Sequence, residues 1–131
     1  MPSTLTIYDE TVGGDRTPAC TLDFLNERIT ARELIRERVY QEVREYNARM
    51  PDYFRGLVEP TEAERVLNGY RLRQRRKIDW EAQFERALKA FERNGFFLLV
   101  DDRQVENPNE VIAISPGTQV SFVKLLPLVG G

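Results

Sequence analysis

The residues best suited to chemistry stand at the end of the sequence, where Gly130 is followed by Gly131. Glycine has no side chain, so its backbone can enter a channel that is too narrow for other residues. A carboxylate on Gly131 can then meet the α-phosphate of ATP, form an acyl-adenylate and pass the acyl group to a thiolate, an amine or sulfide. In that chemistry this protein is the substrate, and a partner supplies the catalytic groups.

Apolar residues lead into the diglycine. They lie beyond the last residue expected in a strand, and they are Leu126, Pro127, Leu128 and Val129. Exposed apolar residues at such a place favour a docking segment for the activating partner over a core position. Phe122, in contrast, shares strand parity with Val120, so we expect its ring in the core.

Missing residue types exclude most self-contained catalysis. The 131 residues include no histidine and one cysteine, Cys20. A Ser-His-Asp triad, a Cys-His dyad, a His-ligated zinc, a Cys-x-x-Cys motif and an internal disulfide are therefore all excluded. We expect no enzyme activity, no cofactor and no metal site. The net charge of -2 gives no general attraction to nucleic acid.

Three other groups have a chemical and a structural interpretation. The basic run from Arg71 to Lys77, next to Trp80, could bind phosphate, but a solvated connector between helices is favoured. Cys20 could be a nucleophile, but its parity with Leu22 and Phe24 favours an inert buried thiol. The Asp101-Asp102 pair could bind a cation, but a hairpin turn is favoured because aspartate bonds to its own backbone there.

Strands are predicted near the start of the chain. Residues 4–10 alternate apolar and polar side chains, and a Gly13-Gly14 turn leads to a second extended run over residues 19–25. Thr30 and Glu33 then form a capping box before an amphipathic helix, which ends near Met50.

Helices and then short strands follow. Pro60 begins a short predicted helix that ends at Asn68-Gly69, and Asp79 caps a longer one that ends at Asn94-Gly95. Short strands are predicted over residues 96–100, 104–105, 111–114 and 119–123. This order predicts an α+β domain in which helices pack on one face of a sheet.

The pattern resembles the ubiquitin-like β-grasp superfamily. Residues 4–47 look like its first hairpin and helix, and residues 96–131 look like its closing strands and tail. The run from Pro116 to Phe122, followed by Pro127 to Gly131, is also similar to the end of the small sulfur-carrier subunit of molybdopterin synthase. The resemblance implies a single domain, 1–131, with a mixed sheet packed on a helix: a β-grasp core over 1–50 and 96–131 and a helical insertion over 51–95.

The resemblance also implies a function. The enlarged shape looks like the divergent modifiers of bacterial ubiquitination-like operons, whose partners are an activating enzyme that uses ATP, a conjugating-enzyme homologue and a metallopeptidase deubiquitinase homologue. We therefore expect a modifier conjugated through Gly131 to a target protein that the sequence does not identify. A sulfur carrier with a C-terminal thiocarboxylate and an assembly module that uses the insertion stay open as alternatives.

The expected location is the cytoplasm. The sequence begins without a basic and apolar signal peptide, its cysteine is unpaired, and no apolar run approaches the roughly 18 residues of a membrane span. We accordingly expect no membrane and no nucleic acid among its partners.

Overall fold

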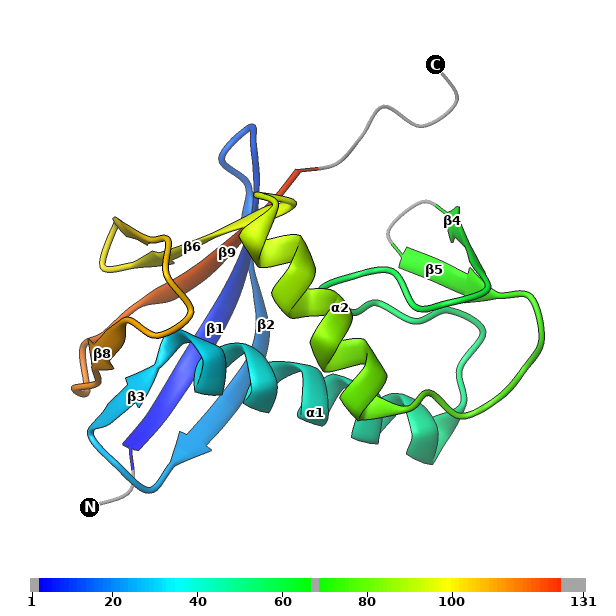
Figure 1. The fold of residues 1–131 in the computed structure, drawn as a ribbon, viewed down its shortest axis with the longest axis horizontal. Helices are drawn as coiled ribbons and strands as arrows, with labels where there is room; N and C mark the ends of the chain where they lie inside the picture. Colours follow the sequence, from blue (N-terminus) through cyan, green and yellow to red (C-terminus); the bar gives the residue numbers. More distant parts are fainter. Residues whose placement is uncertain (1–2, 67–68, 126–131) are drawn as a thin grey trace.

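A five-stranded mixed sheet lies at the centre of the computed structural model, which describes residues 3–66 and 69–125 (Figure 1). Its strands are β1 (Ser3–Thr11), β2 (Arg16–Phe24), β6 (Phe96–Val100), β7 (Arg103–Val105) and β9 (Val120–Lys124). They are arranged in the order β2-β1-β9-β6-β7. β1 and β9 pair in parallel, whereas the other neighbours are antiparallel. The class is α+β, as the sequence predicts.

The first hairpin follows the alternation in the sequence. Leu5 and Ile7 of β1 face Leu22 and the half-buried Cys20 of β2 across the ladder, on the face that the core covers. The register shifts after Ile7, where Ala19 is the extra residue of a bulge. A bulge and a proline on an edge strand such as β2 both limit further strand pairing.

Helix α1 (Ala31–Arg49) crosses the inner face of the sheet (Figure 1). Its cap is the predicted one, since the Thr30 hydroxyl accepts a hydrogen bond from the Glu33 N–H at 3.1 Å. The predicted apolar stripe is buried, and it consists of Leu34, Ile35, Val39, Val43 and Tyr46. Strand β3 (Arg28–Thr30), directly before the helix, pairs with β8 (Val111–Ala113) in a two-stranded sheet. The sequence predicts β8 but not β3.

The described part of residues 51–95 (51–66 and 69–95) contains one helix rather than two. In place of the short helix predicted from Pro60, the chain forms a hairpin of β4 (Ala63–Val66) and β5 (Gly69–Leu72). Glu62 has a φ of 52°, which a right-handed helix does not allow. Ala63 and Leu72 face each other and are both buried, so tertiary packing outweighs the local helix signal.

The second predicted helix is present as α2 (Trp80–Glu92). Asp79 is its cap, accepting a hydrogen bond from the Glu81 N–H at 3.2 Å. Ala87 and Phe91 are buried, and Phe91 packs on Phe96 of β6 with ring centroids 5.8 Å apart. In Figure 1, α2 lies across α1 on the same side of the sheet. None of the helices within the described residues is long and apolar enough to cross a membrane.

Gly56 allows the chain after α1 to approach the core closely. A Cβ at this position would collide with the ring of Phe54 and lie 2.6 Å from Glu42 Oε2. We predict that Gly56→Ala lowers the free energy of unfolding by about 1–3 kcal/mol because the buried site is overpacked.

The matched control is Gly117→Ala. No heavy atom would lie within 4 Å of its added Cβ. Urea denaturation of both variants measures the difference, and equal stability of the two proteins would contradict the close packing at Gly56.

Candidate functional site

The predicted site residues fall into two groups, those up to the end of β9, which the structure describes, and those that follow it. Gly130 and Gly131, together with the predicted docking segment Leu126, Pro127, Leu128 and Val129, lie outside the described residues. The structure does place the residues that precede them. Phe122 is fully buried, as the sequence favours, and Leu125 directly after β9 is 41% exposed.

A buried arginine lies beneath this end of β9. Arg38 of α1 is 1% exposed, although its guanidinium carries a positive charge. Its Nη1 and Nη2 atoms donate hydrogen bonds to Oδ1 and Oδ2 of Asp9 on β1, at 2.6 and 3.0 Å. This two-point geometry is the strongest form of arginine–carboxylate contact, and it joins α1 to the sheet.

The other side of the guanidinium is also occupied. Arg38 Nε donates to Glu42 Oε1 at 2.5 Å, one turn along the same helix. The guanidinium carbon lies 4.6 Å from the ring centroid of Phe122 on β9, within range of a cation–π contact. Glu42 then uses Oε2 to accept a hydrogen bond from the Leu57 N–H at 2.9 Å. The segment after α1 is thereby tied to the same arginine.

Lys124 completes this group at the last residue of β9. Its Nζ lies 3.4 Å from Asp9 Oδ2 and donates to the carbonyl oxygen of Gly56 at 3.2 Å. We call Asp9, Arg38, Glu42 and Lys124 the Arg38 cluster. It contains two cationic and two anionic side chains, so its charges balance, and it connects β1, α1, β9 and the segment after α1.

The cluster favours the charged forms of Asp9 and Arg38. Burial by itself raises the pKa of Asp9, but the hydrogen bonds and charges of Arg38 and Lys124 outweigh it and leave the pKa below its usual value. Burial by itself would lower the pKa of Arg38. The adjacent Glu42 and Asp9 carboxylates outweigh burial, so the pKa of Arg38 is raised above its usual value. An acid or base catalyst needs a pKa near the working pH, so this cluster is suited to fixing geometry rather than to proton transfer.

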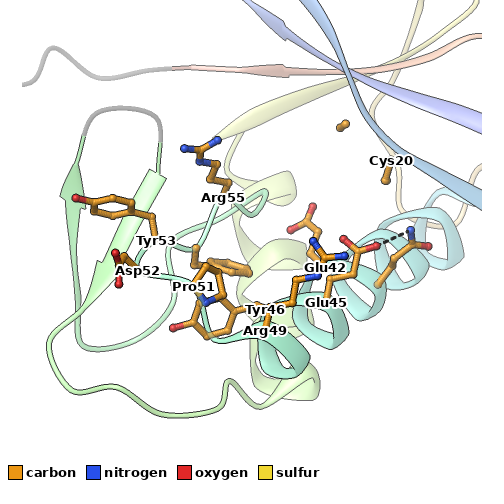
Figure 2. A pocket seen from close by; sticks show the side chains of 12 residues that line it. Cys20, Glu42, Glu45, Tyr46, Arg49, Pro51, Asp52, Tyr53 and Arg55 are labelled. Atoms are coloured by element: carbon orange, nitrogen blue, oxygen red, sulfur yellow. Dashed lines mark hydrogen bonds between the residues drawn. The ribbon is translucent and has the colours of Figure 1, made fainter.

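A groove with a volume of about 530 Å³ runs beside the cluster between β2, the second half of α1 and residues 51–55. Figure 2 shows Cys20 on β2 near Glu42 and Glu45 of α1, with Tyr53 and Arg55 on the segment that follows the helix. Cys20 is half-buried rather than fully buried, and burial raises its pKa to about 11. The thiol is therefore protonated at neutral pH, which disfavours a role as nucleophile.

The basic run bonds to neighbouring parts of the protein. Arg71 of β5 pairs with Glu64 of β4 at 2.9 Å, and Arg76 donates to the Thr61 carbonyl oxygen at 2.7 Å. Arg75 donates to the carbonyl oxygen of Met50 at the end of α1. These contacts favour a structural role over phosphate binding. The predicted connector between two helices is wrong, however, because the run begins in β5 and joins the hairpin to α2.

The Asp101-Asp102 pair lies in the tight turn between β6 and β7. Both residues have positive φ values, 50° and 66°. Asp101 Oδ1 accepts a hydrogen bond from the Gln119 N–H at 2.9 Å. This contact accounts for an acidic side chain at position 101, so no bound cation is needed to explain it. In the part of the chain that the structure describes, no three Cys, Asp or Glu side chains gather as a metal site.

The Arg38 cluster is not predicted from the sequence, although the sequence carries a signal for it. Asp9 continues the inward parity of Leu5 and Ile7, and Lys124 continues that of Val120 and Phe122. Each is a charged residue at a position where the alternation calls for an apolar one. The signal does not show that the two residues meet, because that depends on the parallel pairing of β1 with β9.

No protein-family model, no curated protein and no solved structure matches this chain. The function must therefore be inferred from the fold and the site.

We predict that Arg38→Met lowers the free energy of unfolding by about 3 kcal/mol, because the carboxylates of Asp9 and Glu42 lose their shared cation in a buried place. Arg32→Met is the matched control, since Arg32 is an exposed arginine of the same helix. Urea denaturation of the two variants checks the prediction, and an equal effect at both positions would contradict it.

We predict that Asp9 gives stability an acid-sensitive component. Its pKa is below 3.8 in the folded protein, so the stabilisation is present above that value and is lost as the pH falls through the folded pKa. Asp9→Asn should therefore be less stable than the wild type at neutral pH, and the difference should shrink in acid. Urea denaturation as a function of pH measures this, with the exposed Asp52→Asn as control; a difference that stayed constant with pH would count against it.

Proposed function

We propose that the chain has a ubiquitin-like β-grasp fold and acts as a protein modifier in the cytoplasm, activated through the carboxylate of Gly131. The observation that carries the proposal is the arrangement of the sheet around its last strand. β9 lies in the middle of the sheet, parallel to β1, and α1 crosses the inner face (Figure 1). This ββα…ββ order with a mixed sheet on a helix is what the resemblance implies.

Residues 51–95 fit the same proposal as an insertion. They lie between α1 and β6, and their hairpin β4–β5 forms a separate two-stranded sheet. The five-stranded sheet is formed entirely by residues before and after this segment. The proposal therefore describes a β-grasp core over 1–50 and 96–131 with an insertion that contains a hairpin and α2.

The proposed chemistry places the reactive atom at the end of the sequence. A Gly131 carboxylate oxygen attacks the α-phosphorus of ATP on the activating enzyme, and pyrophosphate leaves. A thiolate of a partner then attacks the acyl carbon and AMP leaves; finally, a target amine takes the acyl group and releases the thiol. The modifier supplies no acid or base, which agrees with its lack of histidine.

We predict that activation depends on Gly131. The full chain, with any tag at its N-terminus, is incubated with ATP, Mg²⁺ and an adenylating enzyme of the ubiquitin-activating type. We expect ATP–pyrophosphate exchange and an intact mass that corresponds to a thioester or adenylate. Deletion of Gly131 should reduce both to background, whereas Gly117→Ala, in an open turn, should retain them.

The products separate the alternatives. Isopeptide-linked adducts after addition of the conjugating-enzyme homologue support the modifier, and a C-terminal thiocarboxylate without adducts identifies a sulfur carrier. Absence of every Gly131-dependent product, for a chain whose mass shows that it ends at Gly131, would contradict activation and leave the assembly module.

A further inference from the structure

We propose that Lys124 is a positioning residue that fixes the point at which the tail leaves the sheet, and so sets how the Gly131 carboxylate reaches the activating enzyme. This inference rests on the proposed function. It concerns a contact within the described residues, at the boundary between the folded body and the reactive end.

Lys124 is the last residue of β9 and is held from three directions. Its backbone pairs with Thr11 on one side and with Phe96 on the other. Its side chain reaches the core face, where Nζ contacts Asp9 at 3.4 Å and the Gly56 carbonyl oxygen at 3.2 Å. The next residue, Leu125, belongs to no strand and is 41% exposed.

The Asp9 partner is itself fixed. Both of its carboxylate oxygens accept hydrogen bonds from the buried Arg38, and the charge of Arg38 is balanced by Glu42. A surface ion pair with two mobile partners contributes little, whereas a charge that meets a pre-ordered partner loses less entropy on pairing. The cluster is therefore a rigid attachment for the end of β9.

The position of the attachment limits where the Gly131 carboxylate can reach, because few residues separate it from β9. The seven residues from Leu125 to Gly131 can span at most about 25 Å, at roughly 3.3–3.6 Å per residue. If the end of β9 frays, the starting point moves and more residues separate the sheet from Gly131. The local concentration of the carboxylate at a fixed catalytic site then falls.

The same contacts argue against Lys124 as the acceptor of an acyl group from another molecule. The ammonium group of Lys124 is engaged by Asp9 and Gly56, whereas the other lysines, Lys77 and Lys89, are exposed. An acceptor of another acyl group needs a free amine. Lys124 is therefore suited to anchoring rather than to accepting a conjugate.

The first test needs no partner enzyme. Amide hydrogen exchange is measured in the full chain for wild type, Lys124→Met and the exposed control Lys89→Met. In Lys124→Met, exchange at Val123–Leu125 should become about tenfold faster, the ratio that corresponds to the loss of one charge-assisted hydrogen bond. Core amides such as that of Leu98 should keep their wild-type rates. Faster exchange at all amides, or no difference from Lys89→Met, would overturn the anchor.

The second test measures positioning in the reaction. With the adenylating enzyme, the KM of the Lys124→Met chain in ATP–pyrophosphate exchange should rise roughly three- to tenfold while kcat stays unchanged, because the end of β9 loses its fixed position and the reactive group is the same. Lys124→Arg, which keeps the charge and donors, should restore the wild-type KM. A general loss of folded protein would also raise the apparent KM, so the folded concentration of each variant, measured by circular dichroism, is taken as its substrate concentration.

The outcomes separate the two proposals. A wild-type chain that shows no Gly131-dependent exchange would overturn the proposed function, and the amide exchange would still decide whether Lys124 anchors β9. A wild-type chain that is activated, with an unchanged KM in Lys124→Met, would overturn only the positioning role.

Discussion

The burial of the Arg38 guanidinium is the constraint on which the packing of this protein depends. Removing such a cation from water costs several kcal/mol, which only well-placed carboxylates and further hydrogen bonds can offset. Here the offsetting groups come from different elements: Asp9 from β1, Glu42 from α1 and the ring of Phe122 from β9. An apolar side chain could fill the same volume in several orientations, but the guanidinium is satisfied in one. We infer that it specifies how α1 sits on the sheet.

In the segment between α1 and β6, too, polar groups are paired by groups from other elements. Here the polar groups belong to the backbone, and side chains of the helices form hydrogen bonds with them. Asn47 of α1 both donates to the Ile78 carbonyl oxygen and accepts from the Ile78 N–H, at 2.9 and 2.8 Å. The buried Gln83 of α2 donates to the Val58 carbonyl oxygen at 2.8 Å. A long connection would otherwise bury unpaired peptide groups, so these amide side chains let an irregular segment pack against the core.

These features agree with a protein that acts as a substrate for partner enzymes. Within the described residues, the charges of the Arg38 cluster balance one another, and the half-buried thiol of Cys20 is protonated at neutral pH. The Arg38 cluster joins the core to the last residue of β9.

The sequence by itself determined the elements whose signals are local: the first hairpin, both long helices with their caps, and the strands after residue 95. It failed where the outcome depended on distant partners. The region from Pro60 carries a helix-start signal, yet Ala63 is buried against Leu72 and the chain forms a hairpin. The inward charges of Asp9 and Lys124 were visible as breaks in alternation, but only the parallel pairing of β1 with β9 brings Lys124 to Asp9, which also pairs with Arg38. Periodicity shows which face of an element is buried, whereas the contacts across that face are set by how the elements pack in three dimensions.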